Sequence, residues 1–190
     1  FLFVWVEAGV SEEWRSLIYS AWAIIFAFGA YVVYIYTANR IAFYIYGATS
    51  VALVGVATAA ELSGPTLTLA YWFEIAAVLV AAGKLGVSSR SLSYIGLLFA
   101  VPALLSVGSL DSRSWRDGIW HNDFVVVIVA IVTLFGFAYL WSMRERSEKN
   151  GLSSVIDKVA LMVGSFFSVS LVWLVTHALL AYDVATTISL

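Results

Sequence analysis

Long apolar runs alternate with short polar segments along almost the whole chain. Six of these runs hold about twenty mostly apolar residues, the number that a helix needs to cross a hydrocarbon core of about 30 Å. Strands of a membrane barrel would instead alternate in polarity over about ten residues, so the pattern predicts helices. We therefore expect an all-α polytopic transmembrane helix bundle with six spans, at residues 17–37, 41–60, 66–86, 91–110, 124–143 and 159–182.

The first four of these spans, residues 17–110, repeat with an offset of fifty residues. In this alignment Trp22 falls on Trp72, and Arg40 falls on Arg90. Each copy contains two spans joined by a short basic turn, so both copies have the same orientation in the membrane. We expect parallel repeats rather than inverted ones, formed by two helical hairpins at residues 17–60 and 66–110.

The rest of the chain divides into three parts. Residues 1–16 are interpreted as an outer or interfacial segment, or as the end of an upstream span, because the apolar run that begins at Phe1 is too short to cross a membrane. We therefore expect the sequence to be a piece of a longer protein. Residues 111–123 are expected to form an interfacial loop on the outer face, and residues 124–190 a third helical hairpin with a longer connection.

Small residues recur at a spacing of four in some spans. Ala48 and Ala52 are one such pair, and Gly55 and Ala59 are another. This spacing places the members of a pair on one face of a helix and is typical of close helix packing in membranes. We expect this face of the second span to be a packing face. Pro102 is expected to disturb the fourth span, because proline cannot donate a backbone hydrogen bond.

The composition requires lipid as the solvent for most of the chain. Hydrophobic residues make up 62% of the 190 residues and charged residues only 12%, whereas soluble domains carry about 25% charge. Cysteine is absent, which excludes disulfides, thiolate metal sites and cysteine nucleophiles. No basic stripe is long enough to predict nucleic-acid binding. The expected partners are membrane lipids, and other membrane subunits or missing parts of the same chain.

Lysine and arginine are distributed unequally between the two sides of the predicted bundle. The side with the larger number is expected to be cytoplasmic, so both termini are expected outside the cell membrane, which we interpret as a bacterial inner membrane. One side receives Arg40, Lys84, Arg90, Arg144, Arg146, Lys149 and Lys158, and the other receives Arg15, Arg113 and Arg116.

Several short motifs in these spans resemble a known family. They are Ser20-Ala21-Trp22 followed by Asn39-Arg40, Tyr71-Trp72-Phe73-Glu74 followed by Gly83-Lys84, and His121-Asn122-Asp123-Phe124 at the start of a span. The chain is similar in these features to the large bacterial predicted membrane proteins grouped as domain of unknown function 2339. The resemblance implies more spans than six and no established activity, and it supplies no catalytic residues.

Two ionisable residues lie inside predicted spans. Glu74 is about 12 Å from the outer end of the third span at 1.5 Å per residue, and an ionisable group at such a depth costs about 2.5–3.5 kcal/mol unless it is paired or protonated. His177 lies at a similar depth in the last span. A Glu–His pair could relay protons, which would indicate a transporter or channel. Equally, each residue could hold the bundle together through hydrogen bonds.

The loop at residues 111–123 contains the groups that an active site on the outer face would need. Arg116 could bind a phosphate or lipid head group, and His121 with Asp117 could carry out acid–base chemistry. This pattern would fit a membrane enzyme that acts on a lipid-linked substrate. Tryptophan, arginine and histidine are also typical of segments that lie at head-group depth, and this is the stronger interpretation.

No cofactor or metal is expected. A haem held by two histidines would need both inside the bundle, but only His177 lies within a span. Lys84 is too close to a span end for a retinal linkage, and no glycine-rich phosphate loop is present. The hypothesis favoured by the sequence is an integral membrane scaffold or assembly module of a larger envelope protein or complex, without catalytic activity. The transporter and the lipid-linked enzyme remain the alternatives.

Overall fold

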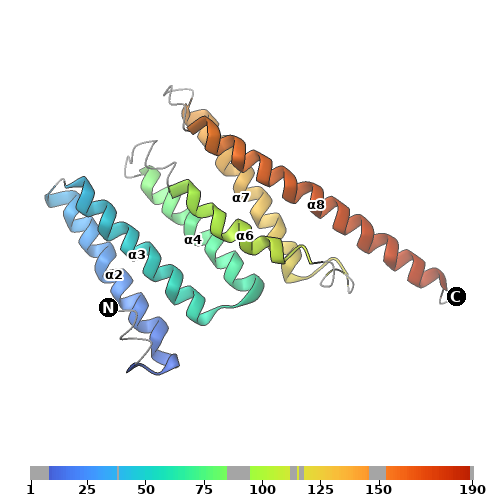
Figure 1. The fold of residues 1–190 in the computed structure, drawn as a ribbon, viewed down its shortest axis with the longest axis horizontal. Helices are drawn as coiled ribbons and strands as arrows, with labels where there is room; N and C mark the ends of the chain where they lie inside the picture. Colours follow the sequence, from blue (N-terminus) through green and yellow to red (C-terminus); the bar gives the residue numbers. More distant parts are fainter. Residues whose placement is uncertain are drawn as a thin grey trace. The chain divides into compact units, whose positions relative to one another are not determined.

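The computed structural model is helical throughout the residues that it describes, which are 9–37, 39–84, 95–111, 115, 118–145 and 153–188. Within these ranges there is no β-strand, as the sequence predicts. The elements are α2 (Glu12–Tyr36), α3 (Arg40–Glu61), α4 (Gly64–Lys84), η1 (Leu97–Phe99), α6 (Ala100–Gly108), α7 (Asn122–Glu145) and α8 (Ser153–Ile188) (Figure 1). The chain forms two compact units, Phe1–Ser63 and Gly64–Leu190.

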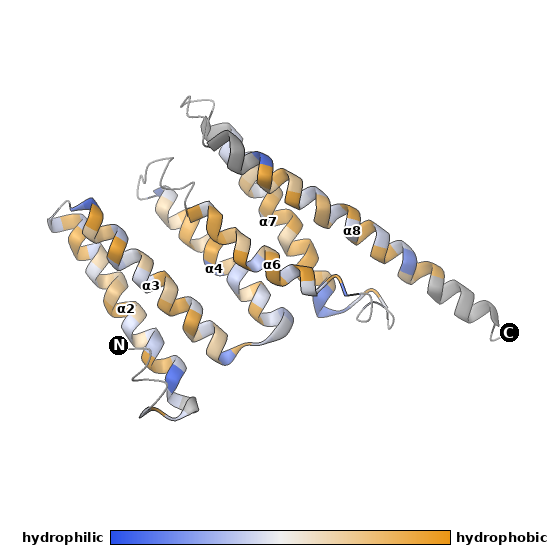
Figure 2. Cartoon of the chain, viewed as in Figure 1, coloured by the Kyte–Doolittle hydropathy of each residue, from blue (hydrophilic) through white to orange (hydrophobic). Residues whose placement is uncertain are grey.

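Five helices in the described ranges are long enough and apolar enough to cross a membrane. Figure 2 shows mainly hydrophobic residues along them, with hydrophilic residues concentrated near the helix ends. These spans are Trp14–Tyr36, Arg40–Glu61, Gly64–Lys84, Asn122–Ser142 and Lys158–Leu180. They correspond to five of the six predicted spans.

The region predicted as the fourth span contains a shorter apolar helix, Leu97–Gly108. It begins as the 3-10 turn η1 and becomes α-helical at Ala100, two residues before Pro102. The 3-10 turn lies three to five residues before Pro102, which cannot donate an N–H to the preceding turn of an α-helix. Residues 91–94, with which this span was expected to begin, lie outside the described residues.

Unit 1 is a hairpin of α2 and α3, which run antiparallel (Figure 1). Asn39 caps α3 by accepting a hydrogen bond from the backbone N–H of Ala42. Ser50 on α3 donates to the backbone oxygen of Ala23 on α2 at 2.8 Å, so the two backbones approach closely. Helix α2 begins five residues earlier than its predicted span, at Glu12, so residues 12–16 belong to a helix.

The face of α3 that meets α2 within unit 1 contains Ser50 and Ala57, which are buried. Ala48 and Ala52 are exposed and do not belong to this face. The packing face expected from this small pair therefore stays a prediction. Small residues occur on more than one face of this helix, and spacing alone does not identify which face meets the partner.

Unit 2 is built around α7, which packs against α4, α6 and α8. Its core is a row of aromatic rings, with Trp72 against Phe99, Phe99 against Phe137 and Phe137 against Trp141 at centroid distances of 5.5, 5.1 and 5.3 Å. The indole N–H of Trp72 donates to Ser106 Oγ at 3.0 Å, and Ser106 Oγ donates to the backbone oxygen of Pro102 at 2.7 Å. These two buried hydrogen bonds join α4 to α6.

Of the two hairpins in the predicted fifty-residue repeat, only the first is described completely. Residues 85–94, where the turn of the second hairpin is expected, lie outside the described residues. The two tryptophans that define the alignment have different surroundings. Trp22 is 38% exposed and contacts Phe26, whereas Trp72 is fully buried. The superposition of the two hairpins therefore stays a prediction.

Candidate functional site

The sequence nominates two groups of residues, one in the loop before α7 and one inside the spans. Of the loop group, Arg116 and Asp117 lie outside the described residues, and His121 lies immediately before α7. Of the intramembrane pair, Glu74 lies in the middle of α4 and His177 lies in α8. The described contacts of these residues decide what each can do.

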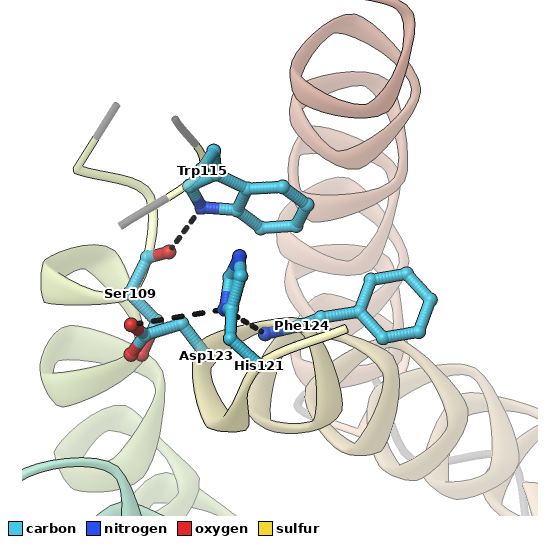
Figure 3. Close-up of polar contacts among 5 residues, drawn as sticks. All are labelled: Ser109, Trp115, His121, Asp123 and Phe124. Atoms are coloured by element: carbon cyan, nitrogen blue, oxygen red, sulfur yellow. Dashed lines mark hydrogen bonds and ion pairs between the residues drawn. The ribbon is translucent and has the colours of Figure 1, made fainter. Parts of the chain in front are cut away.

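His121 caps helix α7. Its Nδ1 accepts a hydrogen bond from the backbone N–H of Phe124 at 3.2 Å (Figure 3), which is the contact that an N-cap side chain makes to the third residue of a helix. Nδ1 also lies 4.0 Å from Asp123 Oδ2. In the contact with the Phe124 amide, Nδ1 is the acceptor, which places the ring N–H on Nε2.

The Nε2 atom of His121 is buried and has no hydrogen-bond partner. Its ring stands edge-on to the indole of Trp115, with centroids 4.6 Å apart and planes at 89° (Figure 3). This geometry lets the Nε2–H point toward the aromatic face, a weak but favourable contact. Trp115 is held in turn by a hydrogen bond from its Nε1 to the backbone oxygen of Ser109 at 3.1 Å. The cluster therefore joins the end of α6 to the start of α7.

This arrangement fits a structural role, capping α7 and holding it to the end of α6, better than acid–base catalysis. A general base needs an accessible lone pair, but the lone pair of His121 is directed at the Phe124 amide and its other nitrogen is buried. Proton transfer through this imidazole would require the cap of α7 to open. Asp123 lies in the first turn of α7, where its negative charge is favourable beside the helix N-terminus.

Glu74 lies at the flank of the packed face of α4. That face contains Thr68, Trp72, Ile75 and Ala82, and Glu74 is turned about 100° from Ile75 around the helix. Its side chain is half-buried, and it interacts electrostatically with Tyr71, one turn earlier. Because α4 begins at Gly64, Glu74 is about 15 Å from the helix start, close to the middle of a hydrocarbon core.

The structure does not bring His177 to Glu74. Helix α8 packs mainly on α7, whereas α4 packs on α6 and α7. The side chain of His177 is exposed, and its ring lies 5.5 Å from that of Trp173, one turn earlier on the same helix. None of the contacts described for His177 involves Glu74, so the pairing of these two residues gains no support here and stays a prediction.

Among the described residues, no group of three or more histidine, aspartate or glutamate side chains is arranged to hold a metal ion. Several described polar side chains make contacts between or within helices, among them Ser50, Trp72 and Ser106. Two of these contacts were missed by the sequence analysis, namely the bond from Trp72 to Ser106 and the bond from Ser16 to Glu61. A buried indole N–H needs an acceptor, so the tryptophan indicated such a contact, although nothing indicated which serine would serve.

The chain matches no protein family, no curated protein and no solved structure. The likeness to domain of unknown function 2339 therefore stays a prediction.

Proposed function

We propose that the chain is an integral membrane scaffold or assembly module, part of a larger envelope protein or complex. The observation that carries this proposal is the extent of uncovered apolar helix surface. In the most apolar 18 residues of each span, only 11% to 33% are buried. Large side chains such as Ile24, Phe73 and Val169 are exposed. Lipid and other membrane helices are the two surroundings that such surfaces fit.

The use of the polar groups supports the same proposal. His121 caps the start of α7. Ser50 bonds α3 to α2, and Ser106 bonds α6 to α4. In a scaffold the polar groups position the helices, and the outer apolar faces meet partners. We further propose six spans with both termini outside a bacterial inner membrane, on the basis of the unequal distribution of lysine and arginine.

Photocrosslinking in native membranes tests the scaffold. Benzoylphenylalanine is introduced at Phe73 or Val169, which are exposed, and at Val127, which is fully buried, as the matched control. A scaffold predicts a protein adduct of defined mass from an exposed position and none from Val127. Adducts with lipid alone from every exposed position would contradict the proposal.

A transporter or channel is the second candidate, and the specific observation that favours it is Glu74. A half-buried carboxylate near mid-depth is expensive in a helix that has only a structural role. Ion and proton flux in liposomes separates the two candidates. A transporter predicts flux that Glu74→Gln abolishes while the protein still folds, whereas a scaffold predicts the same background flux for wild type, Glu74→Gln and empty liposomes.

A further inference from the structure

Unit 1 carries an open groove of about 760 Å³ along the line where α2 and α3 meet. This volume lies in the range of about 300–1,000 Å³ found for small-molecule sites. The walls are formed by one face of each helix, including Ser20, Ala23 and Ala27 of α2 and Val54, Ala57 and Thr58 of α3. The alanines and serines leave space beside the larger side chains of the hairpin.

The polarity of this groove changes along its length. The end formed by the start of α2 and the end of α3 is lined by Ser16, Ser20, Thr58 and Glu61, together with Leu17 and Leu62, so the polar groups of the groove gather at this end. Ser16 donates a hydrogen bond to the carboxylate of Glu61, and the Glu61 side chain remains exposed. Toward the middle of the hairpin the lining becomes apolar, with Ala23, Ile24, Ala27 and Val54. The one hydroxyl there, that of Ser50, is used by the backbone oxygen of Ala23.

The groove also has the length of a single lipid leaflet. From Ser16 to Ala27 is about 17 Å of helix at 1.5 Å per residue, which is roughly half of a hydrocarbon core of about 30 Å. A transmembrane helix packed against this hairpin would use a groove that extends across the whole core. A groove that is polar at the helix ends and apolar toward mid-depth matches a lipid, whose head group is interfacial and whose chains point inward.

We propose that this groove binds a phospholipid whose head group carries a primary ammonium. The Glu61 carboxylate receives the ammonium at the polar end, and an acyl chain lies along Ala23, Ala27 and Val54. An anionic lipid such as phosphatidylglycerol has no ammonium, so its phosphate would lie near Glu61 without a compensating positive charge, which is unfavourable. The site depends on unit 1 being embedded in a membrane and is independent of the scaffold role.

Native mass spectrometry of the full chain in detergent, titrated with phosphatidylethanolamine or phosphatidylglycerol, tests the site. We expect the first phosphatidylethanolamine adduct at a lipid concentration at least tenfold lower than the first phosphatidylglycerol adduct. Glu61→Gln keeps the shape and removes the charge, so it should abolish this preference. Asp111→Asn, a matched change at another exposed acidic residue outside the groove, should leave the preference intact.

A second pair of variants tests the apolar half of the groove. Ala27→Trp fills it and should weaken the binding of the lipid by at least tenfold, whereas Ala21→Trp, at an exposed alanine of α2 outside the groove, should leave binding unchanged. Circular dichroism checks that each variant folds, and Ala27→Leu replaces Ala27→Trp if the latter does not.

Three results would overturn the proposal. Equal affinity of the wild type for the two lipids would show that Glu61 does not select the head group. Equal effects of Ala21→Trp and Ala27→Trp on lipid binding would show that the lipid does not bind in the groove. A change from dimer to monomer on Ala27→Trp would make the groove an interface between two copies of the chain.

Discussion

Several serine and threonine hydroxyls in the described spans donate to the backbone of their own helix. Thr49 donates to the oxygen of Ile45, Ser168 to that of Gly164 and Thr176 to that of Val172, each four residues earlier. In an apolar solvent a hydroxyl must find an acceptor, and the preceding turn always offers one. A serine or threonine inside a span is therefore weak evidence for a polar pathway, which is why residue type alone could not locate a site in this chain.

The role assigned to His121 predicts different effects for two substitutions. His121→Ala removes the side-chain acceptor of the Phe124 amide and leaves the backbone oxygen of residue 121 as its acceptor, so it should lower the free energy of unfolding by about 0.5–1 kcal/mol. His121→Asn restores an N-cap acceptor and should recover most of this loss. Thermal unfolding in detergent measures both variants. Equal losses would show that capping is not what the imidazole contributes.

The bond between Trp72 and Ser106 predicts coupling between two distant positions in the sequence. Both side chains are fully buried, so Ser106→Ala leaves the indole N–H without its acceptor. Interhelical hydrogen bonds in membranes contribute about 0.6–2 kcal/mol. A double-mutant cycle with Trp72→Phe, measured by reversible unfolding in detergent, should give a coupling energy of this size. Strictly additive losses would contradict the bond.

At the scale of helices, length and apolarity predicted the five long apolar helices that the structure describes, but they did not predict the contacts between them. A span is recognised locally, from about twenty consecutive residues. The choice of packing face is not local, because lipid tails are as apolar as the side chains of a neighbouring helix. The exposed Ala48 and the buried Ala57 of α3 illustrate the point, since both are alanines in one span and only their neighbours differ.

Close packing between elements predicts the effect of a single methyl group. A Cβ at Gly96, just before η1, would lie 2.9 Å from Phe137 Cζ, and that ring is held between Phe99 and Trp141. Gly96→Ala should therefore destabilise unit 2 by about 1–3 kcal/mol. Gly136→Ala on α7 is the matched control, because a Cβ there meets nothing within 4 Å, and it should be neutral or stabilising. Thermal unfolding of both variants provides the measurement, and a neutral Gly96→Ala would show that the ring moves freely.

At the scale of the whole molecule, hydropathy predicted an all-helical chain, and the five long apolar helices agree with that prediction. The candidate site was less predictable. The sequence identified His121 and Glu74 as unusual, but its pairing of Glu74 with His177 assumed that residues of similar depth lie close together. Which helices are neighbours depends on contacts far apart in the sequence, such as that of α4 with α7.

The proposed topology can be tested because these 190 residues contain no cysteine. Single cysteines at Asn39 and Asn150 should resist a membrane-impermeant thiol reagent in intact cells and react after the membrane is opened. A cysteine at Ser63, in the connection between α3 and α4, should react in intact cells. Efficient labelling of Asn39 and Asn150 from outside would reverse the orientation.

Helix α8 extends well beyond the thickness of a membrane. It contains 36 residues, about 54 Å at 1.5 Å per residue, whereas its apolar span of 23 residues accounts for about 35 Å. The remaining turns continue the same helix beyond this apolar span. Since long helices bend only gently, a displacement or rotation of one end of α8 would be carried to the other end, more than a bilayer's thickness away.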